Sequence, residues 1–162
     1  MSEQKKQNME SMKEFSAAMN QIWKRIDGLY HLYSMFAQLS DPALCVLYTL
    51  FEDASKRYTQ QDLTTIWSCP KQTMNYTIGA LIKRGWIQLE PCNQARNSKW
   101  IRLTDEGIAF CKKTICPLFD AENRAAMHFN DEDRNRFQSL MEQYGAFLEQ
   151  EIQKTIQEQN PK

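Results

Sequence analysis

The sequence predicts a mainly α-helical protein with one small β-hairpin. Along most of the 162 residues, apolar side chains recur at spacings of three and four, which is the period of an amphipathic helix. Only two short runs, Trp86–Leu89 and Lys99–Thr104, are rich in residues that favour strands, and turn-forming residues separate them. The expected fold is therefore a set of helices with a single two-stranded hairpin.

A short helix with a polar outer face precedes the hairpin. Pro70 suits the first position of this helix, and Ser68 or Cys69 stands where a capping residue belongs. Gly85 suits its C-terminal end. One stripe between these limits is apolar and consists of Met74, Ile78, Leu81 and Ile82. The other faces are polar and carry no acidic side chain, so the helix is expected to present a surface that tolerates a negatively charged partner.

Another short helix comes just before it. Thr59 and Asp62 match a capping box, which predicts a helix that runs through Leu63 to Trp67. Two short helices followed by a hairpin with a basic tip are typical of a winged helix-turn-helix, in which the second helix enters the major groove of DNA. The hairpin is then the wing. This pattern predicts a DNA-binding region.

The charge of the chain is segregated along the sequence. The net charge is +0, yet residues 66–102 hold six basic side chains and one acidic side chain, a local excess of +5. Residues 119–162 hold nine acidic and five basic side chains, a local balance of −4. Positive charge on the predicted recognition helix and wing suits the phosphate backbone of double-stranded DNA.

Long amphipathic helices are predicted on both sides of this region. Asp41 is expected to cap, and Pro42 to begin, a helix that is apolar nearly all round and therefore central. Pro117 falls inside a later helix, where it removes one backbone hydrogen bond and is expected to cause a kink. Asn130 is expected to cap the last helix, which runs to about Gln157.

The domain organisation follows from these elements. A chain of 162 residues suits one domain, with residues 41–104 as the winged helix-turn-helix. The helices predicted in residues 10–40 and 105–157 have apolar faces too long for a monomer of this size to cover, so they are expected to form a dimerisation bundle. A two-fold homodimer suits a pseudo-palindromic operator whose half-sites lie about one helical turn, roughly 34 Å, apart.

Four segments of the chain, in this order, resemble one known family. They are Pro-Lys-Gln-Thr from residue 70, Leu-Ile-Lys-Arg-Gly-Trp-Ile from residue 81, Arg-Asn-x-Lys from residue 96 and Leu-Thr-Asp-Glu-Gly from residue 103. This order is similar to that of the MarR (multiple antibiotic resistance regulator) family of bacterial transcription factors. Family wings commonly carry Asp followed by two Arg, where this chain has Ala95, Arg96 and Asn97. The resemblance implies a repressor that binds its operator as a homodimer and is released by a small-molecule or oxidant signal.

The residues expected to contact DNA lie on the two short helices and the wing. Gln72 and Asn75 can pair bidentately with adenine, whereas Thr73 and Tyr76 suit a phosphate or a thymine methyl group. The other expected contacts are Thr59, Gln60 and Lys71 with phosphate, and Arg96, Asn97 and Lys99 at the wing, with Arg96 in the minor groove. The alternative interpretation is that these are ordinary solvated surface residues.

Two further sites are expected. The resemblance implies an effector cavity next to the first helix, where Trp23, Ile26, Tyr30 and Tyr33 suit a small aromatic or amphipathic ligand; their alternative role is core packing. Cys69 is placed at the positive end of the recognition helix, where a thiolate is favoured, which makes it a candidate redox switch. The alternative is that Cys69 is a small buried apolar residue.

Composition and motifs argue against other classes. No apolar stretch is long enough to span a bilayer and the N-terminus lacks the apolar core of a signal peptide, so a cytoplasmic location is expected. Five cysteines without a Cys-x-x-Cys pair, and the isolated His31 and His128, predict neither a metal site nor a cofactor. No catalytic motif is present, so an enzyme is not expected. The alternative function is a winged-helix module that docks a protein without reading DNA sequence.

Overall fold

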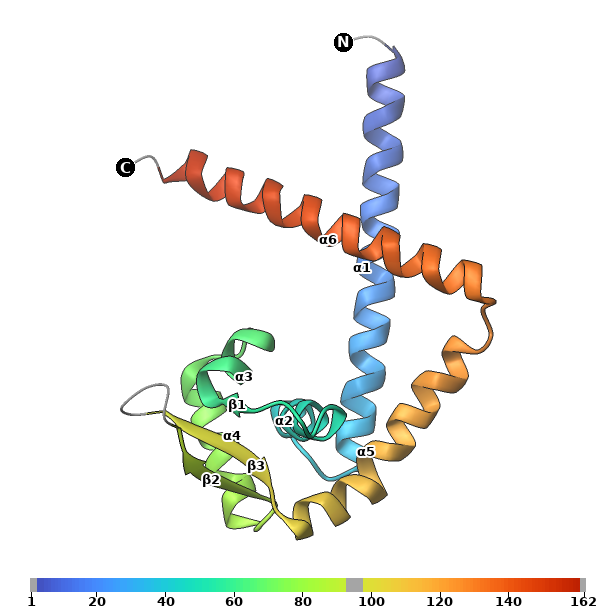
Figure 1. Ribbon diagram of the computed structural model, residues 1–162. Coiled ribbons are helices and arrows are strands. Elements are labelled where there is room, and N and C mark those ends of the chain that lie inside the picture. Colours follow the sequence, from blue (N-terminus) through green and yellow to red (C-terminus); the bar gives the residue numbers. More distant parts are fainter. Residues whose placement is uncertain (1–2, 93–97, 161–162) are drawn as a thin grey trace. The chain divides into compact units, whose positions relative to one another are not determined.

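The computed structural model describes residues 3–92 and 98–160, with side chains from residue 7 onward. Its elements in chain order are α1 (Glu3–Phe36), α2 (Asp41–Glu52), β1 (Tyr58–Thr59), α3 (Gln60–Ile66), α4 (Lys71–Lys83), β2 (Ile87–Pro91), β3 (Lys99–Leu103), α5 (Asp105–Ala126) and α6 (Asp131–Gln159), as Figure 1 shows. The predicted fold class, mainly α with a small hairpin wing, is confirmed. The chain forms two compact units, residues 1–116 and residues 117–162.

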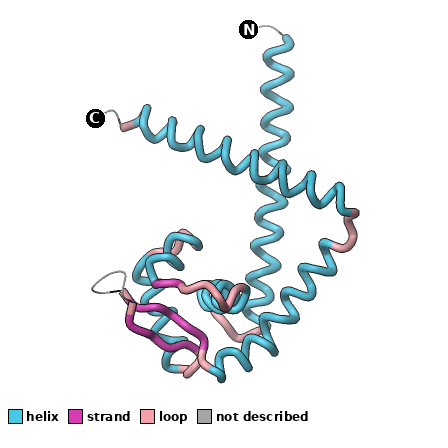
Figure 2. The backbone as a smooth tube through the Cα atoms, viewed as in Figure 1, coloured by secondary structure: helices cyan, strands magenta, loops and turns pink. Residues whose placement is uncertain are grey.

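The sheet has three strands among the described residues, where the sequence predicted two. The order is β1-β3-β2 and both pairings are antiparallel (Figure 2). Leu89 lies opposite Ile101 on one side of β3, and Tyr58 lies opposite the same Ile101 on the other side. Two residues are too few to show the alternation that identifies a strand, so β1 is recognisable only through its pairing with β3.

The core of the first unit lies around α2. The helix predicted to be central is buried on most sides, with Val46 and Leu47 fully inaccessible to solvent. Its neighbours contribute Leu63 from α3, Met74 and Leu81 from α4, Ile87 and Ile101 from the sheet, and Cys111 and Ile115 from α5. One apolar residue or more from each element therefore anchors α3, α4 and the sheet to the same core, and this fixes the recognition helix and the wing strands relative to each other.

The start of α2 differs from the prediction by one residue. Ser40, and not Asp41, is the capping residue, and its hydroxyl oxygen accepts a hydrogen bond from the Ala43 N–H at 3.4 Å. Asp41 is the first helical residue, and its carboxylate accepts a hydrogen bond from the buried Ser34 hydroxyl of α1 and lies 2.9 Å from the His31 ring nitrogen. Asp41 therefore joins α1 to α2, a role that no local pattern predicts.

Stability in acid is expected to depend on Asp41. The hydrogen bond from Ser34 holds the pKa of the Asp41 carboxyl below its usual range, and His31 adds to this effect, although partial burial opposes it. A carboxyl with a lower pKa in the folded protein stabilises the fold above its unfolded pKa, near 3.9, and this stabilisation is lost as the pH falls through the folded value. We expect Asp41→Asn to lose less free energy of unfolding than the wild type between about pH 6 and about pH 3. Urea unfolding at both pH values measures this, and an equal acid sensitivity of the two proteins would contradict it.

The second unit contains the end of α5 and all of α6. Pro117 lies inside α5, at the position where the two units divide. Asn130 caps α6 as predicted, with its side-chain oxygen accepting from the Asp133 N–H at 2.8 Å. In α6, whose residues are all described, no side chain is buried. The exposed large apolar residues of this helix are Phe137, Leu140, Phe147, Leu148, Ile152 and Ile156.

Helix α1 also exposes a long apolar face. Its exposed large apolar residues are Met9, Met12, Phe15, Ile22, Trp23, Leu29, Tyr30, Leu32, Met35 and Phe36. No helix within the described part of the chain is both long enough and apolar enough to cross a membrane. Apolar faces of this extent are typical of protein interfaces.

Candidate DNA-binding surface

The first helix of the helix-turn-helix is held at its start by the predicted capping box. The Thr59 hydroxyl oxygen accepts from the Asp62 N–H at 3.3 Å, and the Asp62 carboxylate accepts from the Thr59 N–H at 2.7 Å. Leu63 is fully buried and anchors the helix to the core. Because the cap uses both the hydroxyl and the N–H of Thr59, the phosphate contact predicted for this residue stays a prediction.

The start of α4 corrects the predicted cap. Pro70 occupies the N-cap position, and the helix begins at Lys71, one residue later than expected. Neither Ser68 nor Cys69 caps it: the N–H groups of both donate back to carbonyls of α3, and Ser68 adopts a left-handed backbone with φ 46°. The connection between α3 and α4 is too tight to bring either side chain to the start of α4.

The start of α4 therefore lacks a side-chain cap and has no acid in its first turn. The N–H groups of a helix's first turn have no partner within the helix. Together with the helix dipole, they favour an anion such as phosphate at this end. The exposed Lys71 adds a full positive charge at the same place.

The two faces of α4 divide as the sequence predicted except at two residues: Ile82 of the predicted apolar stripe is 39% exposed, and Thr77 is buried in addition. Met74, Thr77, Ile78 and Leu81 are buried against the core. The predicted base-reading residues are all exposed: they are Gln72, Thr73, Asn75 and Tyr76. Tyr76 is 81% exposed, so its ring is offered to solvent and not to the core. The face of α4 on which base recognition was predicted is thus exposed to solvent.

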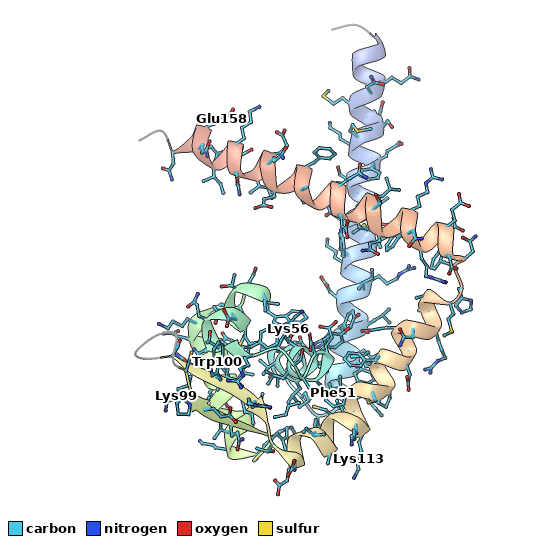
Figure 3. All side chains as sticks on the ribbon, viewed as in Figure 1. Phe51, Lys56, Lys99, Trp100, Lys113 and Glu158 are labelled. Carbon is cyan, nitrogen blue, oxygen red and sulfur yellow. The ribbon has the colours of Figure 1, made fainter. Side chains whose placement is uncertain are left out.

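A shallow hollow lies between α3, α4 and the wing strands. Its volume is about 280 Å³, and among the described residues its charged lining consists of Lys71 and Lys99. Gln60 and Asn75 also line it, and the Gln60 side-chain N–H donates a hydrogen bond to the Asn75 side-chain carbonyl. Figure 3 shows Lys99 and the neighbouring Trp100 on β3. The structure therefore brings together four polar residues that belong to three separate elements.

The basic residues of the wing and of the end of α4 before it are not equivalent. Arg102 pairs with Glu90, the one acidic residue of this region, across the β2–β3 ladder, with 3.7 Å between their charged atoms. Arg84 stacks on the Trp86 ring at 4.8 Å. Lys99 is exposed at the start of β3. Arg96 and Asn97, the predicted minor-groove residues, lie outside the described residues.

The predicted effector residues of α1 differ in environment. Trp23 and Tyr30 are 41% and 40% exposed, so they are not core residues of the isolated chain. Ile26 and Tyr33 are half-buried. The Tyr33 hydroxyl donates to the Thr114 carbonyl of α5 at 2.6 Å, and burial raises the Tyr33 pKa. The polar end of Tyr33 thus already has a partner, and an effector site on this face stays a prediction.

The cysteines also differ. Burial, assisted by the nearby Asp41 and Cys69, raises the pKa of Cys45 to about 11, and burial raises that of Cys111 to about 12. Both thiols therefore stay protonated at neutral pH, as expected of core residues. Cys69 is half-buried, and its sulfur lies 3.8 Å from the Pro70 carbonyl oxygen. In the described ranges, no group of three or more His, Cys, Asp and Glu residues is arranged to hold a metal ion.

Comparison with known proteins defines the class to which this surface belongs. Residues 39–107 match the model of the winged helix DNA-binding domain. This region contains α2 to α4, the three strands and the start of α5, so the prediction of a winged helix-turn-helix is confirmed.

About 85% of the chain has the fold of a solved MarR family regulator, and the resemblance predicted from the sequence is confirmed. A MarR family regulator from Neisseria meningitidis matches with a TM-score of 0.68 and 22% identity, over 85% of this chain and 98% of its own. The DNA complex of S. aureus MepR matches with a TM-score of 0.66 and 15% identity, over 83% and 97%. NadR in complex with 4-hydroxyphenylacetate matches with a TM-score of 0.67 and 13% identity, over 80% and 91%. No curated protein matches the sequence.

Proposed function

We propose that this protein is a MarR-type transcriptional regulator, a repressor, that reads a pseudo-palindromic operator with α4 in the major groove. One observation carries this proposal: α4 has an uncapped, acid-free start with Lys71 beside it, followed by an exposed polar face. Phosphate at the helix start positions such a helix, and the polar side chains of its first turns then reach base edges. The DNA complex of MepR, a protein of the same fold, supports DNA binding by this fold.

The regulator acts as a homodimer in this proposal. The apolar faces of α1 and α6 support it, because six large apolar residues of α6 are exposed and none is buried. A helix of this kind gains most of its stability from tertiary packing, so it needs a partner surface. A second copy of the chain supplies one, and its two-fold symmetry matches that of a pseudo-palindrome.

A signal that favours the unbound state releases the operator. The complex of NadR with 4-hydroxyphenylacetate supports an aromatic effector, for which Trp23 and Tyr30 of α1 offer exposed rings. Such a ligand weakens DNA binding only to the extent that it binds the non-DNA state more tightly. An oxidant signal acts instead through Cys69, next to α4. A Cys69→Ser variant separates the two, because only the oxidant response needs the thiol.

The test of the proposed function is selection of bound duplexes from random DNA by the purified protein, followed by titration of the enriched duplex at several salt concentrations. We expect a two-fold pseudo-palindrome, with log affinity falling against log salt by about 0.9 for each phosphate neutralised. Lys71→Ala and Arg96→Ala should each make this slope shallower, by about one unit per subunit. Binding without sequence preference would instead support the winged-helix interaction module that docks a protein.

A further inference from the structure

The hydrogen bond between Gln60 and Asn75 joins the two helices of the helix-turn-helix. Gln60 is the first residue of α3, and Asn75 is the fifth residue of α4, on its exposed face. The side-chain N–H of Gln60 donates to the side-chain carbonyl oxygen of Asn75. Gln60 is half-buried, and its main-chain carbonyl accepts from the Thr64 hydroxyl at 2.8 Å, which ties its backbone to α3.

This bond limits what Asn75 offers to a partner. The asparagine amide has one carbonyl oxygen, which accepts through two lone pairs, and one NH₂ group, which donates through two hydrogens. Bidentate reading of adenine needs both at once, the oxygen for the N6 amino group and the NH₂ for N7. Because Gln60 engages one lone pair of the oxygen and sets the plane of the amide, the oxygen of Asn75 is turned toward α3 and its NH₂ group is the part of the amide that stays fully available. Its natural partners in the major groove are acceptors, and guanine presents two of them, N7 and O6.

We propose that Gln60 is a positioning residue for base recognition, which orients Asn75 so that its amide donates to acceptor atoms of the major groove, guanine foremost. This inference rests on the proposed function and specifies which atoms of the bases the Asn75 amide contacts. It also changes the role of Gln60, for which the sequence alone predicted a phosphate contact. The hollow between α3, α4 and the wing strands contains both residues together with Lys71 and Lys99, so phosphate contacts have other donors there.

The two roles of Gln60 predict different behaviour of Gln60→Ala. A phosphate contact would weaken binding to all sequences alike and make the salt slope shallower by about 0.9 for each phosphate. A positioning residue leaves the slope unchanged and reduces discrimination only at the base pairs that Asn75 reads. The loss of discrimination there should be roughly threefold to thirtyfold, and Asn75→Ala and Gln60→Ala should be strongly non-additive.

The experiment is the duplex selection carried out with the wild type, Asn75→Ala, Gln60→Ala and the double variant, each followed by titration against salt. Asn75→Ala identifies the base pairs that Asn75 reads, and we expect guanine to be favoured there by the wild type and adenine to gain with Gln60→Ala. The matched control is Gln61→Ala, the neighbouring glutamine, whose amide contacts Thr65 within α3 at 3.5 Å. This control should retain the wild-type preference. Gln60→Ala keeps the backbone bond to Thr64, and circular dichroism checks that the variants remain folded.

The outcomes separate the inference from the proposed function. If the wild type selects a defined sequence and Gln60→Ala selects the same bases at the Asn75 positions, the positioning role is wrong and the proposed function stands. A wild-type preference for adenine at those positions would show that Asn75 does not act as a donor to guanine. The inference would then be wrong, and the proposed function would still stand. If the wild type selects no sequence at all, the proposed function itself is wrong and the inference falls with it.

Discussion

Replacement of Gly107 by alanine is expected to destabilise the protein by about 3 kcal/mol or more. Gly107 lies in the first turn of α5, and an added Cβ atom would stand 1.9 Å from the carbonyl oxygen of Trp86 and 2.8 Å from its carbon. These atoms are backbone, so they cannot move aside as the end of a flexible side chain does.

The surroundings of Trp86 also resist movement. Its carbonyl accepts the Thr104 N–H at 3.0 Å, and its ring stacks on Phe110 with 3.7 Å between the ring centroids. A side chain at residue 107 would therefore clash with Trp86 unless α5 shifted against the start of the wing. Because α5 contributes the buried Cys111 and Ile115, such a shift would also disturb the core.

Chemical unfolding of Gly107→Ala measures this effect, and Gly79→Ala is the matched control. Gly79 is inside α4, and an added Cβ atom there would have no atom within 4 Å. Alanine is favoured over glycine in a helix interior by about 1 kcal/mol, so Gly79→Ala should raise the free energy of unfolding. If both substitutions changed the free energy of unfolding by similar amounts, the contact with Trp86 would not be what disfavours a side chain at residue 107.

The largest expected effect on DNA binding is that of Gln72→Ala. Gln72 is exposed in the first turn of α4, the part of a recognition helix that reaches base edges. A good bidentate contact contributes about 1–3 kcal/mol of discrimination. Because the proposed homodimer would make the contact twice, affinity for the selected operator should fall by about 2–6 kcal/mol, roughly thirtyfold to twenty-thousandfold.

Titration at one fixed salt concentration, with the operator and with unrelated DNA, measures this loss. Gln88→Ala is the matched control, because Gln88 is an exposed glutamine on β2, outside the recognition helix, and its amide lies 3.4 Å from Glu90. Gln88→Ala should leave operator affinity nearly unchanged. An equal loss on operator and unrelated DNA with Gln72→Ala would show that Gln72 contacts phosphate and reads no base.

The elements that were predicted correctly have local signals. The capping box at Thr59 and Asp62, the end of α4 at Gly85 and the cap of α6 at Asn130 each depend on residues within one or two turns. The apolar stripe of α4 needs only the helical period, and it correctly separated the buried Met74 and Ile78 from the polar face.

The errors have tertiary causes. Strand β1 is two residues long and exists through its pairing with β3, about forty residues later in the chain. The residues that were predicted to cap α2 and α4 do not cap them, and the reasons are related. Asp41 pairs with α1, and the tight turn after α3 directs Ser68 and Cys69 away from α4. In each case a partner outside the local segment decided the outcome.

The sequence by itself determined the order of elements, the polar face of the recognition helix and the local excess of positive charge, because composition and short-range periodicity specify these. Only the tertiary structure decided which of those polar groups and charges are already engaged. Glu90 neutralises Arg102 across the sheet, Thr114 accepts from the Tyr33 hydroxyl, and Gln60 engages the carbonyl of Asn75. Hydrogen bonds and ion pairs of this kind need atoms within about 4 Å, and residues far apart in sequence reach that distance only when the common core packs.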